Sequence, residues 1–198
     1  MAEIRRGRPR SEQSRRAVLE ATRDLLEANG YDKLSIEGIA ARAAVGKQTV
    51  YRWWASKAAV VADAVLDGFI PMAPLSLADT GDLSADLTAW LDQVAKATRS
   101  NAHAGLIRAL AAAVSTDEPT GDRLWERFTG PDRQAVIERL QSGVESGQVR
   151  ADADLAVTAD LIAGVTLFSV MARKEPSDDF TSRLVPILLS GIVPRTGA

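Results

Sequence analysis

The sequence predicts an all-α protein with an N-terminal three-helix helix-turn-helix domain and a C-terminal helical body, about nine helices in total. Alanine, leucine and charged residues dominate its 198 residues, 46% are hydrophobic, and long alternating strand patterns are absent. Two short helical segments near the N-terminus are also separated by a tight turn, as in a helix-turn-helix.

The first helix is predicted to end at Asn29, with Ser11 or Ser14 as its N-cap and Asn29-Gly30 as a left-handed stop. One face of this helix is predicted to pack inward. It consists of Val18, Thr22, Leu25 and Leu26.

Ser35 is the predicted N-cap of a second helix over 36–43, and a break at 44–46 precedes a third helix over about 47–54. Ser56 is the predicted N-cap of a fourth helix over about 57–69. Pro71 and Pro74 then interrupt the helical pattern, which predicts a domain boundary near residues 70–80.

The sequence pattern after this boundary predicts six further helices and a loop over 116–121. The helices are expected over about 83–99, 104–114, 124–128, 132–146, 154–173 and 179–191, with Pro186 inside or at the first turn of the last. The predicted organisation is therefore a disordered basic arm over 1–10, a helix-turn-helix domain over 11–70 and a helical domain over 71–198.

The spacing in 36–54 separates an inner face from an outer one. The predicted inner residues are Ile36, Ile39, Ala40, Ala43, Val50 and Trp54, and Trp53 lies about 100° round from Trp54, at the rim. The outer side chains can bond phosphates and base edges. They are Lys47, Gln48, Thr49, Tyr51 and Arg52.

The segment Leu34–Val65 resembles the DNA-binding region of TetR-family transcriptional regulators. The matching elements are Ser35, Ile39-Ala40, Ala43–Gly46, Tyr51–Trp54 and Lys57. The resemblance implies a homodimer that binds a palindromic operator in double-stranded DNA. The absence of cysteine suits the cytoplasmic location that we expect. It also implies a small hydrophobic ligand that binds the C-terminal domain and relieves repression.

Two residues in the turn depart from the family pattern, because Ala44 replaces the usual glycine and Gly46 the usual serine. A positive φ is costly for alanine, so we expect Ala44 to be more helical and Gly46 to take the sharp bend. Trp53 stands where a histidine is frequent. Its indole N–H is nevertheless predicted to reach a phosphate.

Ser35, Arg52 and Lys57 are predicted to contact phosphates. For Lys57 the reason is its place at a helix N-terminus, which favours anions. The N-terminal arm is basic as well, through Arg5, Arg6, Arg8 and Arg10. Its Arg-Gly-Arg-Pro resembles an AT-hook core, which inserts into a narrow minor groove; unspecific phosphate attraction by a disordered tail is the equal alternative.

Charge is divided unevenly along the chain. Residues 1–60 carry 12 Lys+Arg and 7 Asp+Glu, whereas residues 61–198 carry 12 and 19. A net charge of +5 on the first part and −7 on the second indicates that the first part binds a polyanion. The alternative function is an architectural protein that binds the minor groove of AT-rich DNA. The helix-turn-helix argues against this alternative, because an architectural protein does not need to read the base sequence.

In the C-terminal domain we predict a ligand pocket lined by apolar and aromatic residues. The candidates are Trp90, Val94, Leu110, Trp125, Phe128, Ile137, Val165 and Phe168. The family resemblance implies a dimer interface on the last two helices. Its candidate residues are Leu161, Val165, Phe168, Leu184, Ile187, Leu188 and Ile192.

An enzyme is the remaining function class, with acidic residues such as Asp154 and Asp160 as its candidates. The sequence shows no nucleophile–base pair, glycine-rich phosphate loop or metal-ligand cluster, and it contains no cysteine and one histidine, His103. We therefore expect no enzymatic activity, no metal and no cofactor.

No run of 18 apolar residues or signal-peptide pattern is present, so no membrane association is expected.

Overall fold

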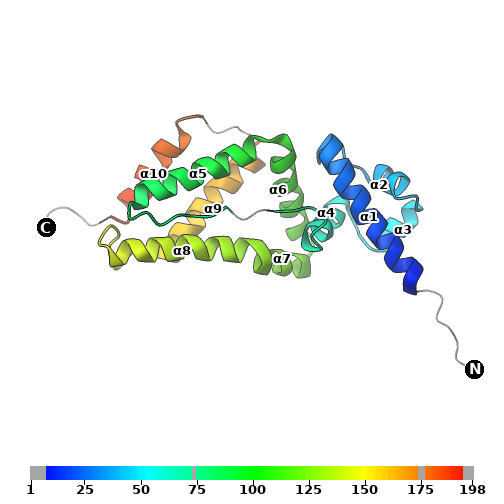
Figure 1. The fold of residues 1–198 in the computed structure, drawn as a ribbon, viewed down its shortest axis with the longest axis horizontal. Coiled ribbons are helices and arrows are strands. Elements are labelled where there is room, and N and C mark those ends of the chain that lie inside the picture. The colour runs from blue at the N-terminus through cyan, green and yellow to red at the C-terminus, as the bar shows by residue number, and fades with distance from the viewer. Residues whose placement is uncertain (1–7, 73–74, 174–176, 194–198) are drawn as a thin grey trace, which may run out of the picture. The chain divides into compact units, whose positions relative to one another are not determined.

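The structure is a computed structural model that describes residues 8–72, 75–173 and 177–193 (Figure 1). These residues contain ten α-helices and one π-helical segment, and none of them lies in a strand. The all-α prediction is confirmed. Among the described helices, none has both the length and the apolar character needed to cross a membrane.

The chain forms two compact units. Unit 1 combines residues 1–72 with 101–124, and unit 2 combines residues 73–100 with 125–198. This division differs from the expected one at residue 70, because residues 101–124 join the N-terminal unit.

Unit 1 contains six helices. They are α1 (Arg8–Asn29), α2 (Ile36–Arg42), α3 (Lys47–Tyr51), α4 (Lys57–Leu66), α6 (Asn101–Val114) and α7 (Glu118–Leu124). Seven of the ten residues of α4 are buried, so this helix is apolar on nearly every side. Because such a helix must be covered all round, α1 packs on one part of its surface and α6 and α7 on others.

Several predicted boundaries in unit 1 were wrong. Helix α4 ends at Leu66 rather than about Phe69, and α6 begins at Asn101 rather than Ala104. Helix α1 begins at Arg8 rather than at a serine cap, so the basic arm does not extend to residue 10. Pro9 is compatible with this start because proline is tolerated in the first turn of a helix. Helix α3 ends at Tyr51 rather than Trp54, and α7 begins at Glu118, inside the expected loop.

The turn between α2 and α3 also differs from the expectation. Ala44 has a φ of +52°, in the left-handed region, whereas Gly46 has an ordinary extended conformation with φ −71° and ψ 145°. The left-handed conformation thus occurs at the position where the family pattern has glycine. Replacing that glycine by alanine has not shifted the conformation to Gly46. The sharp bend that we expected at Gly46 therefore lies at Ala44, and with it the strain of a left-handed alanine.

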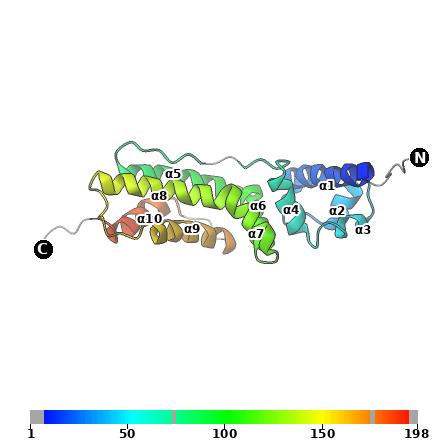
Figure 2. The ribbon, with the colours of Figure 1, turned by 90° about the horizontal axis from the view of Figure 1, so that it is seen from below.

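Unit 2 contains α5 (Leu83–Arg99), a π-helical segment η1 (Trp125–Thr129), α8 (Gly130–Glu145), α9 (Leu155–Met171) and α10 (Phe180–Ser190). Figures 1 and 2 show α5 and α8 side by side, with α9 and α10 on one side of this pair. The predicted helices over 124–128 and 132–146 are not separated by a break at Gly130-Pro131, because η1 leads directly into α8 and Pro131 lies in its first turn.

The core of unit 2 is apolar and comes from all four α-helices. Its largest fully buried side chains are Leu83, Leu87, Leu140, Ile162 and Val185. A buried ion pair joins α5 and α8, with 2.7 Å between Arg139 Nη2 and Asp86 Oδ2. Hydrogen bonds from Thr80 are the main reason that the pKa of Asp86 lies below its ordinary value.

Candidate DNA interface

Helices α2 and α3 form the predicted helix-turn-helix, and its predicted inner residues are buried except Ala43, which is half-buried. Ile39 and Val50 have no exposed surface, and Trp54 is only 4% exposed. Ser35 caps α2 by accepting a hydrogen bond from the Gly38 N–H at 3.1 Å. Gly46 is the N-cap of α3 and offers no side-chain hydrogen bond.

The outer face of α3 carries the polar residues that were predicted to read DNA. Lys47, Gln48, Tyr51 and Arg52 are exposed, and Thr49 is half-buried. Trp53 is half-buried and stacks on Trp54, with 5.9 Å between the two ring centroids. One surface therefore presents side chains able to bond both bases and phosphates.

Lys47 has an acidic neighbour within the motif. Its ammonium forms an ion pair with Glu37 of α2. The hydrogen bond between them raises the pKa of Lys47 and lowers the pKa of Glu37. A phosphate that binds Lys47 must compete with this carboxylate, and the sequence alone gave no sign of the pair.

Lys57 lies at the N-terminus of α4, as predicted, but its side chain has protein partners that the sequence did not indicate. Its ammonium donates hydrogen bonds to the carbonyl oxygens of Tyr31 and Leu34 at 3.1 and 3.0 Å, and lies 4.4 Å from the centroid of the Tyr31 ring. Lys57 thus anchors the connection between α1 and α2. An ammonium has three N–H donors, so one is left for the phosphate contact that we predict.

The basic arm is described only in part. Arg5 and Arg6 lie outside the described residues, and the backbone of Arg8 and Arg10 belongs to the first turns of α1. The predicted minor-groove contact therefore stays a prediction.

The predicted pocket residues are divided between the two units. Leu110 belongs to unit 1, and the other seven belong to unit 2. Trp125 and Phe168 are 50% and 72% exposed, whereas Ile137 packs against the core of unit 2. The side chain of Trp90 donates a hydrogen bond to the Leu75 carbonyl at 3.3 Å.

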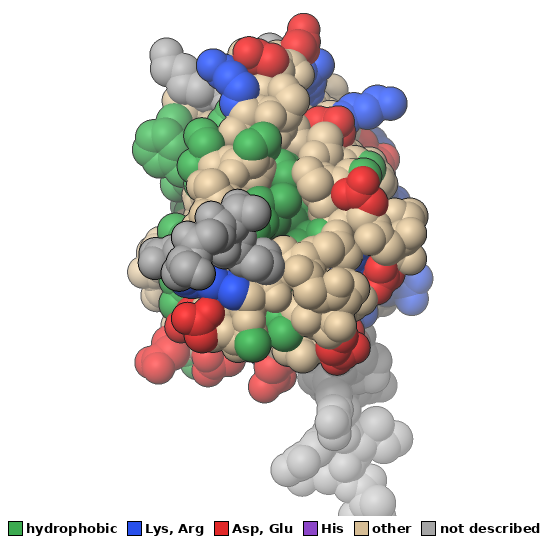
Figure 3. Space-filling view, turned by 90° about the vertical axis from the view of Figure 1, so that its left-hand side faces the viewer, with side chains coloured by type: hydrophobic (Ala, Val, Ile, Leu, Met, Phe, Trp, Pro, Cys, Tyr) green, Lys and Arg blue, Asp and Glu red, His purple; other side chains and the backbone are tan. Residues whose placement is uncertain are grey.

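The predicted dimer residues include an exposed apolar set on α9 and α10. Leu161, Phe168 and Ile187 are 55%, 72% and 69% exposed. Val165, Leu184 and Leu188 are half-buried, but Ile192 is only 7% exposed and belongs to the core, so it cannot lie on a free surface. Hydrophobic side chains also show at the end of unit 2 that contains α10 (Figure 3).

Two further residues complete the apolar stripe on α9. Val157 and Met171 are 53% and 50% exposed, and with Leu161 and Phe168 they recur every three, four or seven residues. This spacing places all four on one face of the helix. The same spacing is present in the sequence, so the signal for these two residues lies in the helical periodicity of 157–171.

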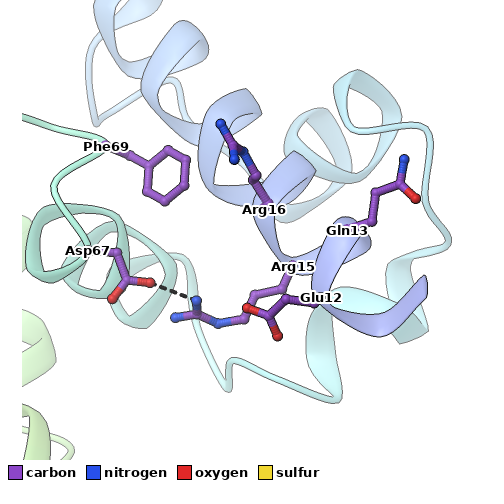
Figure 4. Close-up of a pocket in the computed structure, with 6 residues that line it drawn as sticks. All are labelled: Glu12, Gln13, Arg15, Arg16, Asp67 and Phe69. Atoms are coloured by element: carbon purple, nitrogen blue, oxygen red, sulfur yellow. Dashed lines mark ion pairs between the residues drawn. The ribbon is translucent and has the colours of Figure 1, made fainter. Parts of the chain in front are cut away.

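A hollow of about 630 Å³ lies in unit 1 (Figure 4). Its lining residues come from α1 and from the end of α4 and the segment after it: Glu12, Gln13, Arg15, Arg16, Asp67 and Phe69. Four of these six side chains are charged, so the hollow differs from the apolar pocket that we predicted.

The acidic residues considered for catalysis have structural partners. Asp154 caps α9 by accepting a hydrogen bond from the Val157 N–H at 3.0 Å, and Asp160 forms an ion pair with Arg133 at 2.6 Å. Within the described residues, no three His, Asp or Glu side chains gather as they would around a metal ion.

Comparison with known proteins agrees with this geometry. Residues 18–64 match the model of the bacterial regulatory proteins of the tetR family, and residues 77–187 match that of a tetracyclin repressor-like C-terminal domain. The HTH-type transcriptional regulator YdeS of Bacillus subtilis is 32% identical over 95% of this chain and 94% of its own length. The DNA-binding transcriptional repressor TetR of Mycobacteroides abscessus is 30% identical over 98% of this chain and 99% of its own.

A solved structure agrees as well. The TetR family transcription regulator SCO0332 is 33% identical, covers 92% of this chain and 100% of its own, and superposes with a TM-score of 0.59. The chain therefore belongs to the TetR family and is a helix-turn-helix transcriptional regulator.

Proposed function

We propose that this protein is a cytoplasmic homodimeric repressor that binds a palindromic operator and releases it when a small hydrophobic molecule binds the body. The observation that carries the proposal is the surface of α3. Lys47, Gln48 and Tyr51 are exposed on it, while Val50 and Trp54 fix its opposite side in the core. Such a helix can enter the major groove with its polar face towards the base edges.

A homodimer explains how so short a helix can select one site in a chromosome. Two copies of α3 related by a dyad would read half-sites about 34–36 Å apart. The apolar stripe of α9 supports the dimer, because large exposed apolar residues that share one face mark an interface. Repression is supported by the M. abscessus relative, which is named as a repressor.

Nuclease footprinting tests the function directly. We expect a short, dyad-symmetric protected region in the DNA near the gene for this protein. A diffuse footprint over AT-rich DNA would instead favour the architectural alternative and would contradict the proposal.

Substitutions at Gln48 of α3 and at Arg52, the residue directly after it, separate base readout from phosphate contact. Gln48→Ala should cost about 1–3 kcal/mol of operator binding and relax preference at one base pair, if the amide forms a bidentate contact. Arg52→Ala should instead weaken binding to operator and random DNA alike. Equal losses on both DNAs for both variants would contradict the assignment of Gln48 to base readout.

Induction by a ligand is the second half of the proposal. A coupling free energy of about 1–3 kcal/mol between the ligand site and the DNA site would lower operator affinity about 5–150-fold. Operator DNA must weaken ligand binding by the same factor, because the coupling is reciprocal. A candidate ligand should therefore change the fluorescence of Trp90 or Trp125 and release the operator over one concentration range; saturation without release would exclude that ligand as an inducer.

A further inference from the structure

The carboxylate of Asp63 on α4 joins four parts of unit 1. Its Oδ2 accepts hydrogen bonds from the indole N–H of Trp54 at 2.9 Å and from Arg15 Nη2 of α1 at 3.0 Å. Its Oδ1 accepts a hydrogen bond from Arg123 Nη1 of α7 at 3.3 Å. The side chain of Asp63 is only 20% exposed, so these partners replace most of its water.

Asp67, one helical turn further on, shares two of these partners. Arg15 and Asp67 form an ion pair, drawn as a dashed line in Figure 4, with 2.6 Å between Nη1 and Oδ2. Arg123 Nη2 lies 4.0 Å from Asp67 Oδ1. The Arg15 guanidinium also lies 5.9 and 6.0 Å from the ring centroids of Trp53 and Trp54. We call Arg15, Trp54, Asp63, Asp67 and Arg123 the Asp63 cluster.

The cluster includes Trp54, which follows α3, the helix proposed to enter the major groove. Helix α3 spans five residues, and Val50 is the one that is buried among them. Such a short helix has little surface of its own with which to fix its orientation. Trp54 follows three residues after its end and is buried, so the position of its indole helps to fix the axis of α3.

A buried indole N–H needs an acceptor, and here the acceptor is Asp63. The direction of that carboxylate depends in turn on the two arginines that hold it. Arg123 comes from α7, outside the helix-turn-helix, and its side chain is 51% exposed, so it can be changed without opening the core.

We infer that Asp63 is a positioning residue for DNA recognition, which orients α3 through the Trp54 indole, and that Arg123 adjusts this orientation through Asp63. The inference rests on the proposed DNA binding and extends it to residues that do not touch DNA. It also predicts that α7 affects operator recognition by way of one carboxylate.

Four variants test the inference in the full-length protein. Trp54→Phe identifies the indole N–H signal of Trp54 in ¹⁵N–¹H spectra, since it removes that one signal. Arg123→Gln removes the ion pair to Asp63 but keeps a polar side chain. Arg127→Gln is the matched control, because it makes the same charge change four residues along, where the guanidinium lies over the Phe128 ring at 5.8 Å. Asp63→Asn keeps the size of the side chain and removes its charge.

Arg123→Gln should move the Trp54 indole signal and weaken operator binding by about 1.5- to 5-fold relative to Arg127→Gln, with random-DNA binding and thermal stability matching the control. Asp63→Asn should move the same signal further and weaken operator binding by about 5- to 100-fold. An unmoved Trp54 signal in Arg123→Gln, or equal losses on operator and random DNA, would overturn the inference.

The spectra keep this test separate from that of the proposed function. If the wild-type protein protects no operator, the proposed function fails. The response of the Trp54 signal to Arg123→Gln still shows whether Arg123 affects the Trp54 indole through Asp63. If the operator is protected and the signal does not respond, the positioning role fails alone. Arg123→Gln decides the question even if Asp63→Asn does not fold.

Discussion

At the scale of single residues, Ala44 has the backbone conformation that least suits its side chain. Its φ of +52° lies in the left-handed region, which costs an L-residue with a Cβ atom about 1–2 kcal/mol. Glycine avoids this cost but loses more chain entropy on folding. Ala44→Gly should therefore raise the free energy of unfolding by about 0.5–1 kcal/mol.

Denaturant unfolding of Ala44→Gly and Ala41→Gly would check this prediction. Ala41 is exposed inside α2, where glycine should destabilise by about 1 kcal/mol, so the two variants should change stability in opposite directions. A loss of stability in both would show that the left-handed conformation carries little strain.

The pair between Lys47 and Glu37 leads to a second prediction at this scale. The carboxylate competes with DNA for Lys47, so Glu37→Gln should raise affinity for operator and random DNA. The plot of log affinity against log salt should become steeper by about 0.9 if one phosphate contact is gained. Glu145→Gln in unit 2 makes the same charge change away from the motif and should leave the slope unchanged; an unchanged slope in Glu37→Gln would contradict the competition.

At the scale of helices, the caps of α2, α3 and α4 form a natural comparison. Ser35 and Ser56 accept hydrogen bonds from N–H groups at 3.1 and 3.2 Å, but Gly46 offers α3 no side-chain acceptor. A Cβ at Gly46 would come no closer than 3.9 Å to Thr49 Oγ1, which leaves room for a side chain. Gly46→Ser should therefore stabilise α3 by a few tenths of a kcal/mol, roughly the difference between serine and glycine caps.

Thermal unfolding of Gly46→Ser, with Gly46→Ala as the control for the added Cβ, would check this prediction. Serine should be the more stable of the two, because alanine lacks the hydroxyl. Ser56→Ala should lower stability by about 1 kcal/mol in the same assay. Equal stability of the two Gly46 variants would mean that water caps α3 as well as a hydroxyl does.

The sequence predicted the helices best where one physical signal dominated. Helix α5 begins and ends where its pattern predicted, because Asp82 caps it and its apolar face is regular. Pattern alone was misleading at Ala44, where alanine keeps the left-handed conformation, and at Gly130-Pro131, where the helical path continues through the π-helical segment.

The interface could be predicted in outline but not in its contacts. The spacing in 36–54 placed the inner and outer residues of α3, because helical geometry fixes which side chains share a face. Sequence spacing says nothing about partners from distant elements. The contacts of Lys57 with Tyr31 and Leu34, and of Asp63 with Arg123, therefore appeared only in three dimensions.

At the scale of the whole molecule, the apolar stripe of α9 should decide the oligomeric state. Phe168 is its most exposed member at 72%, and burial of a phenylalanine side chain contributes about 1.5–3 kcal/mol. In a dyad-symmetric interface each residue occurs twice. Phe168→Glu should therefore dissociate the proposed homodimer at micromolar concentrations, because it removes two apolar contacts and brings two like charges towards the same interface.

Loss of the dimer should also change how the operator is bound. A dimer binds both half-sites in one step, whereas separate monomers bind each half-site with its own weak affinity, so the gain from linkage, about 10²–10⁴-fold, disappears. Analytical ultracentrifugation and titration of whole and half operators would measure both effects. Val114→Glu is the control, because Val114 is 47% exposed but lies on α6 in unit 1. If Phe168→Glu stays dimeric, or if it becomes monomeric and still binds the whole operator at wild-type affinity, α9 does not form the interface on which operator recognition depends.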